Sequence, residues 1–446
     1  MTFGFLITSQ TREELHAAFP ILRAAVALIL PKYLDRGKDP CFQDTIHSMN
    51  ALELCPRLSY QQGNGNKRVT YQDQEIGDVL MVPFPCWTFE QPDFEKEKMK
   101  IVSDYYYKLH YNNGSLENTF IDKIIEGMAK AYLLKDTNVF GLGGYTSVVM
   151  MPKALRGLNY FVDSKISKKL EQFVSELYKS ESDFLKSHLT EKEIQEGILD
   201  RISELSDKDF NVKTYNTSGS YLTAWYSFKG IEEICKKNNL DLENTPIAMY
   251  GLGSVSRAVT ELILQNYESA DIHIIRRNSA KLSRDISELT EIYPKARIQG
   301  SLQDFVPNDK KIVVVATSML QPFLKAEHLD DKTIVLDDGR PKSMNAEEIR
   351  LLEEKGGQYF TLGLVKSKIH ENKPIVEHGL GRRIMQVAQL KENQHLACFA
   401  ETLILDKMLR DGIDPEIISR YSSLRVNLDY IKYIVEIADD IFEVDI

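Results

Sequence analysis

The stretch Tyr250-Gly251-Leu252-Gly253-Ser254-Val255-Ser256-Arg257-Ala258-Val259 decides the fold expected for this chain. It follows a short apolar segment, Ile247 to Tyr250, and opens a segment with helical periodicity. A strand, a glycine-rich turn and a helix in this order are typical of a dinucleotide-binding turn, in which the glycines let a pyrophosphate approach the backbone. The pyrophosphate would lie at the positive end of the helix, against Gly251, Gly253, Ser254, Val255 and Ser256. An ordinary strand-to-helix turn is the competing interpretation.

Basic residues follow the second expected strand, which spans Asp271 to Ile275. They are Arg276 and Arg277, with Asn278 next in the chain. An NAD site usually places an acidic residue here for the ribose 2′-hydroxyl, whereas guanidinium groups suit a 2′-phosphate. The pattern therefore favours NADPH as the cofactor, held in part by these three residues. The competing interpretation is that the arginines are merely solvated at a strand end.

From about residue 229, helical and strand patterns alternate, which is typical of a parallel sheet with crossover helices. The expected strands are Ile247 to Tyr250, Asp271 to Ile275, Lys311 to Ala316, Thr333 to Leu336 and Gln358 to Leu362. Ligands bind outside the carboxyl ends of such strands. The residues expected to face the nicotinamide half are Thr317, Ser318, Met319, Asp338 and Gly339. Residues 229–385 are therefore predicted to form a central Rossmann-type NADP-binding domain.

The rest of the chain divides on either side of this unit, because 446 residues exceed the size of one hydrophobic core. Residues 1–228 mix strand and helix patterns and predict an α/β substrate domain, with a charged helical insertion at about 153–210. Residues 386–446 predict a helical segment, with helices over Leu396 to Leu409 and Leu428 to Phe442 and no strand. The fold class is therefore α/β.

Composition limits the partners and the compartment. A net charge of −10 gives no global attraction to nucleic acid, although a local basic patch and peripheral membrane contact stay open. No apolar run is long enough to span a bilayer, and the first residues do not resemble a signal peptide, so a cytoplasmic protein is expected. The cysteines are too widely spaced for a zinc site, so we expect free thiols and no metal. They are Cys41, Cys55, Cys86, Cys235 and Cys398.

Further motifs are spread over most of the chain. The most specific is Leu396-Ala397-Cys398-Phe399-Ala400-Glu401, and two more are Leu142 to Ser147 and Thr217 to Trp225. The others are Phe3 to Ile7, Ala316 to Met319, Leu336 to Lys342 and Ile375 to His378. Together they resemble the motifs of the long-chain fatty acyl-(acyl carrier protein) reductases, which form aldehydes with NADPH. The first three look like that family's FACFAE, LGGFTS and TTGNTHTAY.

This resemblance implies that Cys398 is the nucleophile that accepts the acyl group. Without it, a cysteine in such an apolar segment would be taken as a buried core residue. The implied thioester donor is acyl carrier protein or coenzyme A, and an aldehyde-consuming enzyme would act downstream. His378 is a candidate proton donor, because imidazole titrates near neutral pH, or else a structural histidine. The candidate substrate residues are Gly143, Gly144, Tyr145, Thr146, Thr217, Ser218, Gly219 and Ser220.

Departures from the family pattern leave other functions open. Ser256 replaces the last glycine of the family's turn, and Leu222 replaces its histidine. His395 precedes Cys398 by three residues and would share its helix face, but the family motif has no histidine there. One alternative is a dehydrogenase of the shikimate type, which needs no cysteine. The other is a non-catalytic NADPH-binding scaffold that uses the charged helices of residues 153–210 to hold a partner.

Overall fold

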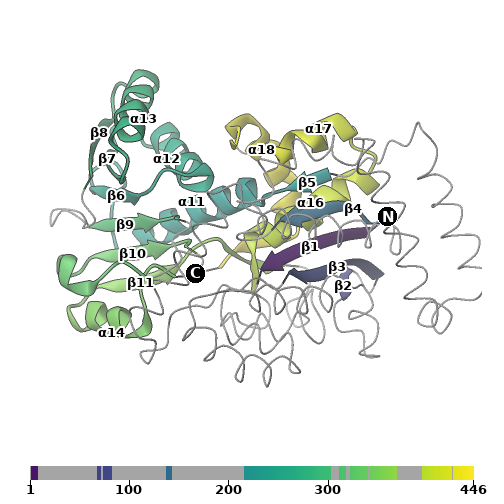
Figure 1. The fold of residues 1–446 in the computed structure, drawn as a ribbon, viewed down its shortest axis with the longest axis horizontal. Helices are drawn as coiled ribbons and strands as arrows, with labels where there is room; N and C mark the ends of the chain where they lie inside the picture. Colours follow the sequence, from purple (N-terminus) through teal and green to yellow (C-terminus); the bar gives the residue numbers. More distant parts are fainter. Residues whose placement is uncertain are drawn as a thin grey trace, which may run out of the picture.

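The computed structural model describes residues 2–8, 68–71, 74–82, 137–142, 215–302, 311–317, 322–339, 342–368, 394–423 and 425–445. These residues form three sheets, of five, six and three strands, together with the helices around them (Figure 1). The predicted helical insertion at 153–210 lies outside the described residues, so it stays a prediction.

The six-stranded sheet confirms the predicted Rossmann-type fold. Its strands are β6 (Ile247–Tyr250), β7 (Asp271–Ile275), β8 (Arg297–Ser301), β9 (Ile312–Val315), β10 (Ile334–Asp337) and β11 (Gln358–Thr361). They lie in the order β11-β10-β9-β6-β7-β8, and every neighbouring pair is parallel. Counted along the chain, this is the order 6-5-4-1-2-3 of a doubly wound dinucleotide-binding sheet, in which the strand order reverses between β6 and β9.

The five strands expected from the sequence match β6, β7, β9, β10 and β11 to within one residue at each end. Strand β8 was not among the strands expected from the sequence. This strand forms the edge of the sheet, none of its residues is buried, and Arg297 and Gln299 are exposed. An edge strand of this kind lacks the continuous apolar run that reveals a buried parallel strand.

Helices cover both faces of this sheet (Figure 1). They are α12 (Ser254–Asn266), α13 (Ser279–Ile292) and α14 (Ala346–Glu354). Successive residues of β6 point to opposite faces. Met249 belongs to the core that contains Leu262 of α12, whereas Ala248 belongs to the core that contains Leu352 of α14. The central strands β6, β9 and β10 are therefore buried on both sides, as their unbroken runs of apolar residues predict.

The five-stranded sheet belongs to the predicted N-terminal unit. Its strands are β1 (Thr2–Thr8), β2 (Arg68–Tyr71), β3 (Gln74–Val82), β4 (Thr137–Leu142) and β5 (Tyr215–Thr217). They lie in the order β2-β3-β1-β4-β5, with β2 antiparallel to β3 and the other pairs parallel. This sheet agrees with the α/β class expected for the N-terminal part of the chain.

The C-terminal part contains the two predicted helices, α16 (Ala397–Arg410) and α18 (Leu428–Ala438). The shorter helices are η2 (Ala326–His328), α17 (Pro415–Ser419) and η3 (Arg420–Ser422). The expectation of no strand beyond residue 385 is wrong, because β13 (Gln394–Leu396) and β14 (Phe442–Val444) flank β12 (Leu364–Ser367) in an antiparallel sheet. Strands of three residues are too short to show an alternating pattern. Because β14 is so short, the helix that begins at Leu428 was expected to continue to Phe442. The helix α18 ends at Ala438, and Phe442 is the first residue of β14.

Helix α11 (Ser220–Lys237) connects the two larger sheets. In Figure 1 it runs from beside β5 toward the six-stranded sheet. It contacts α12 of the nucleotide-binding unit and also α16 and α18 of the C-terminal part. The boundary expected between residues 228 and 229 falls inside this helix, and one hydrophobic core includes Val139, Met249 and Leu403.

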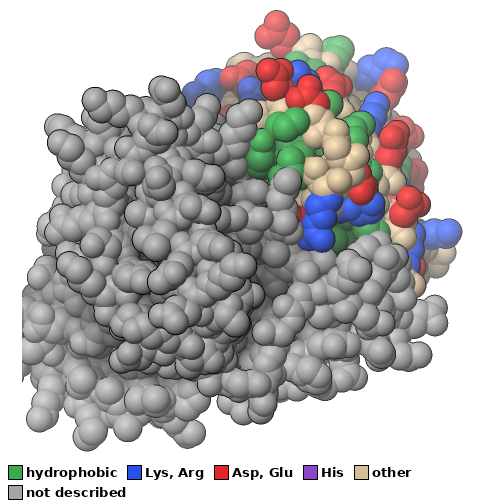
Figure 2. All heavy atoms as spheres, turned by 90° about the vertical axis from the view of Figure 1, so that its right-hand side faces the viewer, with side chains coloured by type: hydrophobic (Ala, Val, Ile, Leu, Met, Phe, Trp, Pro, Cys, Tyr) green, Lys and Arg blue, Asp and Glu red, His purple; other side chains and the backbone are tan. Residues whose placement is uncertain are grey.

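The surface carries charges of both signs. Figure 2 shows acidic, basic and apolar side chains interspersed on the described part of one face. Within the described ranges, no helix has both the length and the apolar character needed to cross a membrane.

Candidate active site

The glycine turn after β6 has the backbone geometry that the sequence predicts. Gly251 adopts φ +75°, a left-handed conformation that favours glycine, and its N–H donates to the carbonyl of Ile275 at 2.9 Å. A Cβ at Gly251 would lie 3.0 Å from Cγ2 of Thr317. Thr317 follows β9, so this contact lies at the reversal point between β6 and β9. Gly251 and Thr317 therefore meet where a dinucleotide binds in such sheets.

The start of α12 fits a phosphate group. Gly253 is exposed and precedes the first residue of the helix, and its N–H donates to Oγ of Ser256 at 2.8 Å. This bond explains how Ser256 takes the place of a third glycine, because its buried side chain closes the turn. Oγ of Ser254 is buried and has no hydrogen-bond partner within the described part of the chain. A phosphate oxygen would satisfy it together with the N–H groups of the first helical turn.

The strand ends on the nicotinamide side are held by buried hydrogen bonds. Asp337, the last residue of β10, is fully buried. Its carboxylate accepts from the N–H of Gly339, from the N–H and hydroxyl of Ser343, and from the hydroxyl of Tyr359, at 2.6 to 2.7 Å. Asp337 therefore fixes the loop that carries Asp338 and Gly339, two of the predicted cofactor residues.

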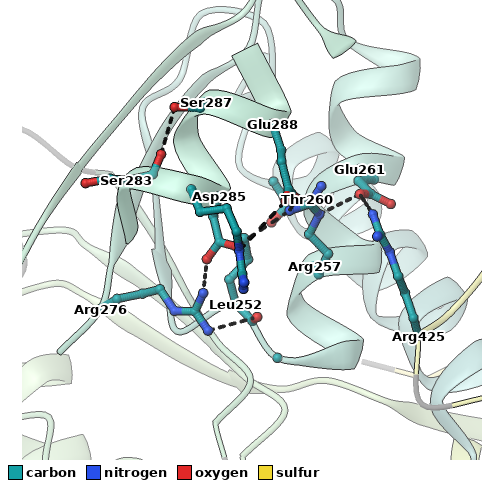
Figure 3. Close-up of polar contacts among 12 residues, drawn as sticks. Leu252, Arg257, Thr260, Glu261, Arg276, Ser283, Asp285, Ser287, Glu288 and Arg425 are labelled. Atoms are coloured by element: carbon teal, nitrogen blue, oxygen red, sulfur yellow. Dashed lines mark hydrogen bonds and ion pairs between the residues drawn. The ribbon is translucent and has the colours of Figure 1, made fainter. Parts of the chain in front are cut away.

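Arg276 is held within a network of charged side chains (Figure 3). Its Nη1 forms an ion pair with Oδ2 of Asp285 on α13, and its Nη2 donates to the carbonyl of Leu252 at 3.3 Å. Asp285 also lies 3.8 Å from Nη1 of Arg257, which contacts Glu288 at 3.2 Å. The guanidinium predicted to hold a 2′-phosphate thus already has an anionic partner, and it ties α13 to the glycine turn.

The next two residues after β7, Arg277 and Asn278, differ from each other in their surroundings. Arg277 is exposed. Oδ1 of Asn278 accepts from the N–H of Lys281 at 2.9 Å, so this side chain caps α13. Arg276 and Asn278, which were predicted to recognise the adenosine end, therefore also hold the protein's own structure.

Cys398 is the second residue of α16 and is partly buried. It lies directly against Gly219, the residue that precedes α11 and adopts φ +72°. A Cβ at Gly219 would overlap both Cβ and Cα of Cys398. The structure therefore brings together the predicted nucleophile and the predicted substrate turn of Thr217, Ser218, Gly219 and Ser220. Two helices, α11 and α16, begin at this contact, and helix N-termini favour negative charge.

A second glycine connects the cysteine to the nucleotide-binding unit. Gly363 follows β11 with φ +67°, and its carbonyl accepts from the N–H of Ala397 at 2.9 Å. A Cβ at Gly363 would overlap Oδ1 of Asp338 and lie 3.3 Å from Cγ2 of Thr223 on α11. Ala397, the residue before Cys398, is thus hydrogen-bonded to Gly363, which lies against the side chain of Asp338. Cys398 lies beside the carboxyl edge of the six-stranded sheet.

His395 does not share a helix face with Cys398, contrary to the expectation. It lies in β13, opposite Val365, because α16 begins only at Ala397. Its ring is buried against Phe399 and Phe442, with centroid distances of 5.9 and 6.3 Å. Burial lowers the pKa of His395 to about 4, so the ring is neutral near pH 7.

Glu401 was missed by the sequence analysis. It is fully buried, and it accepts hydrogen bonds from Thr217 Oγ1 and from the N–H of Leu222 at 2.8 Å. Burial raises its pKa to about 7, although the hydrogen bonds from the turn act in the opposite direction. The signal in the sequence was a single charged residue in the otherwise uncharged stretch Leu396 to Leu405. The remaining predicted site residues lie outside the described part: Gly143, Gly144, Tyr145, Thr146, Ser318, Met319 and His378.

The strand order and the turn at α12 define a Rossmann-type dinucleotide-binding fold. No protein-family model and no curated protein matches the chain. Similar solved structures include 5-ketofructose reductase of Gluconobacter sp., with 12% identity over 44% of this chain and 62% of that one, and a TM-score of 0.26. Quinate dehydrogenase of Corynebacterium glutamicum, in complex with NAD, has 12% identity over 47% of this chain and 64% of that one, and a TM-score of 0.28.

Shikimate 5-dehydrogenase of Thermus thermophilus, in complex with NADP(H) and shikimate, is also similar. It has 16% identity over 44% of this chain and 61% of that one, with a TM-score of 0.23. Each of these matches covers less than two thirds of the other protein.

Proposed function

We propose that the chain is a nicotinamide-dependent oxidoreductase and, more specifically, that it uses NADPH to reduce a fatty acyl thioester to the aldehyde through Cys398. The observation that carries this proposal is the position of Cys398, which lies against Gly219 and is linked through Ala397 and Gly363 to Asp338. Dinucleotides bind along this edge of the sheet. A cysteine at this position can hold an acyl group beside a hydride donor.

The chemistry follows from the thiolate, which is both a nucleophile and a good leaving group. Sγ of Cys398 attacks the thioester carbonyl, the bond to the carrier sulfur breaks, and the carrier leaves as a thiolate that takes up a proton. The acyl group held on Cys398 would then accept a hydride, which NADPH would supply when bound. The bond to Cys398 then breaks, the aldehyde leaves, and the thiolate is regenerated. The helix N-termini of α11 and α16 at Cys398 favour its anionic form.

The cofactor would be held by the glycine turn and by the strand ends described above. Gly251, Gly253 and Ser254 would hold the pyrophosphate, because the unpartnered hydroxyl of Ser254 lies at this turn. Thr317, which contacts Gly251, and Asp338 would lie at the nicotinamide end. The preference for NADPH rests on the exposed Arg277, because the guanidinium of Arg276 is paired with Asp285. The acyl donor is acyl carrier protein or a coenzyme A thioester.

The test is covalent labelling. The protein is incubated with an acyl-coenzyme A and no NADPH, and the intact mass is measured. We expect a gain of one acyl group on the peptide that contains Cys398, and added NADPH should release it as aldehyde. Cys398→Ala should abolish labelling and turnover while NADPH still binds, and Cys398→Ser should be nearly as inactive. Cys235→Ala is the matched control, because this thiol is buried in α11 and burial raises its pKa to about 12.

Other outcomes point to the competing functions. A hydroxyl–carbonyl dehydrogenase on the same fold would turn over NADPH after its thiols are alkylated. A non-catalytic scaffold would bind NADPH and oxidise none of it with any thioester. A Cys398→Ala variant that keeps more than about a tenth of the wild-type rate would contradict the proposal, because a loss below about 1.4 kcal/mol is too small for a covalent nucleophile.

A further inference from the structure

Glu401 is a buried acid that the reaction above does not use. It lies three residues after Cys398, one turn along the same face of α16. Its two carboxyl oxygens accept from Thr217 Oγ1 and from the N–H of Leu222. Both partners belong to the turn that contacts the cysteine.

Hydrogen bonds within the turn connect the Glu401 carboxylate to the residue that contacts Cys398. The N–H of Gly219 donates to Thr217 Oγ1 at 3.0 Å, and the carbonyl of Gly219 accepts from Thr223 Oγ1 at 2.6 Å. Gly219 is thereby fixed in its left-handed conformation, with its Cα directly against Cys398. A continuous chain of contacts runs from Glu401 through Thr217 and Gly219 to the cysteine.

We infer that Glu401 is a positioning residue for Cys398: it holds the turn of residues 217–222 against the cysteine, and its charge sets the reactivity of the thiol. The inference rests on the proposed role of Cys398 as the reactive thiol, and it adds the group that controls this thiol. A carboxyl group at the start of α11 neutralises the positive end of that helix when it ionises. It also brings a negative charge within one helical turn of the thiolate.

The surroundings of Glu401 allow this charge to change near neutral pH. Burial raises the pKa of Glu401 to about 7, so the acid is neutral below that pH and ionised above it. Its ionisable neighbours include Tyr221 on α11 and Tyr421 in η3, whose pKa values are raised, chiefly by burial, so both phenols stay neutral. His395 on β13 is also neutral in this range. Strands β1 and β4, which also contact α16, contain no ionisable side chain.

The experiment measures the rate at which iodoacetamide alkylates Cys398 from pH 5.5 to pH 9, by the mass of its peptide. It needs neither NADPH nor an acyl substrate. The variants are Glu401→Gln, which keeps the shape and cannot ionise, and Asp406→Asn as the matched control. Asp406 is a second buried acid on α16, paired with Arg410 and about two helical turns from Cys398, and burial raises its pKa to about 6.

We expect the wild-type profile to show a step near pH 7 that disappears in Glu401→Gln. Above that pH the Gln variant should react at least threefold faster, because no negative charge opposes the thiolate, while Asp406→Asn should follow the wild type. Superimposable profiles of wild type and Glu401→Gln would overturn the inference. Acyl labelling of Cys398 would in that case leave the proposed function standing. A step near pH 7 without acyl labelling would contradict the proposed function and leave the control by Glu401 in place.

Discussion

At the scale of single residues, glycines bring the parts of the candidate site into contact. Gly219 and Gly412 both adopt left-handed backbone, with φ +72° and +80°. A Cβ at Gly219 would overlap Cys398, whereas at Gly412 it would meet no atom within 4 Å. The two positions therefore separate the cost of the backbone conformation from the cost of losing the close approach.

We expect Gly412→Ala to lower the free energy of unfolding by about 1 kcal/mol, the cost of left-handed backbone for alanine. Gly219→Ala should cost about 2 kcal/mol more, because Cβ also forces Cys398 and α16 to move. Urea unfolding of both variants measures the difference. Equal losses would show that the turn does not pack against the cysteine as described.

Arg276 and Arg277 give a second prediction at this scale. Arg276→Ala removes the nearer of the two cationic partners of the buried Asp285 and releases the carbonyl of Leu252, so the glycine turn itself should loosen. We expect NADPH and NADH binding to weaken alike, by about 1.4 kcal/mol or tenfold. Arg277→Ala should weaken NADPH selectively. Fluorescence titration with both cofactors is the measurement, and an NADPH-selective loss in Arg276→Ala would instead make Arg276 the 2′-phosphate ligand.

At the scale of elements, the small sheet of β12, β13 and β14 places His395 where it cannot hold a proton. The pKa of His395 falls from 6.5 to about 4 on folding, so the unfolded chain binds the proton more tightly. Its contribution to stability is full above pH 6.5 and is lost as the pH falls from 6.5 to 4. Glu401 acts in the opposite direction, because its raised pKa makes ionisation costly as the pH rises from 4.5 to 7.

A comparison of variants isolates the histidine from the glutamate. We expect His395→Leu to flatten the acid side of the stability profile, so that the wild type loses about 3 kcal/mol relative to this variant between pH 7 and pH 4. Urea unfolding at four pH values gives the difference, in which the contribution of Glu401 cancels. A constant difference over this range would mean that the ring reaches solvent or a proton acceptor.

The elements that the sequence predicted are those with a strong local pattern. Buried strands such as β6 and β9 are continuous apolar runs, and the turn at Gly251 has its own signature. The role of Glu401 could not be predicted in this way, because its partners Thr217 and Leu222 are distant in sequence. The roles of Asp285 and Asp337 depend on how a strand end, a loop and a helix pack together, which no local pattern specifies. Gly219 and Cys398 were each expected to belong to the site, but their contact, 179 positions apart along the chain, was not predicted. Local patterns do not encode such tertiary contacts.

At the scale of the whole molecule, α11 makes the nucleotide-binding unit and the cysteine helix parts of one core. Side chains of α11, α12 and α16 belong to the same buried cluster, which also includes residues of β4 and β14. Cofactor binding at the glycine turn should therefore stabilise all of these elements together.

The last prediction measures this coupling by thermodynamic linkage. A ligand at 100 times its Kd stabilises the folded state by about 2.7 kcal/mol. NADPH at that concentration should therefore raise the free energy of unfolding by this amount. The same shift should appear in circular dichroism and in the alkylation of Cys235, which is buried in α11 and becomes accessible on unfolding. Gly251→Ala should abolish the shift, because its Cβ strains the turn against Thr317. Gly356→Ala has a similar left-handed backbone, and there a Cβ would make only an ordinary 3.7 Å contact with Lys332, so it should keep the shift. If NADPH delayed the loss of circular dichroism but not the exposure of Cys235, α11 would unfold independently of the nucleotide-binding sheet.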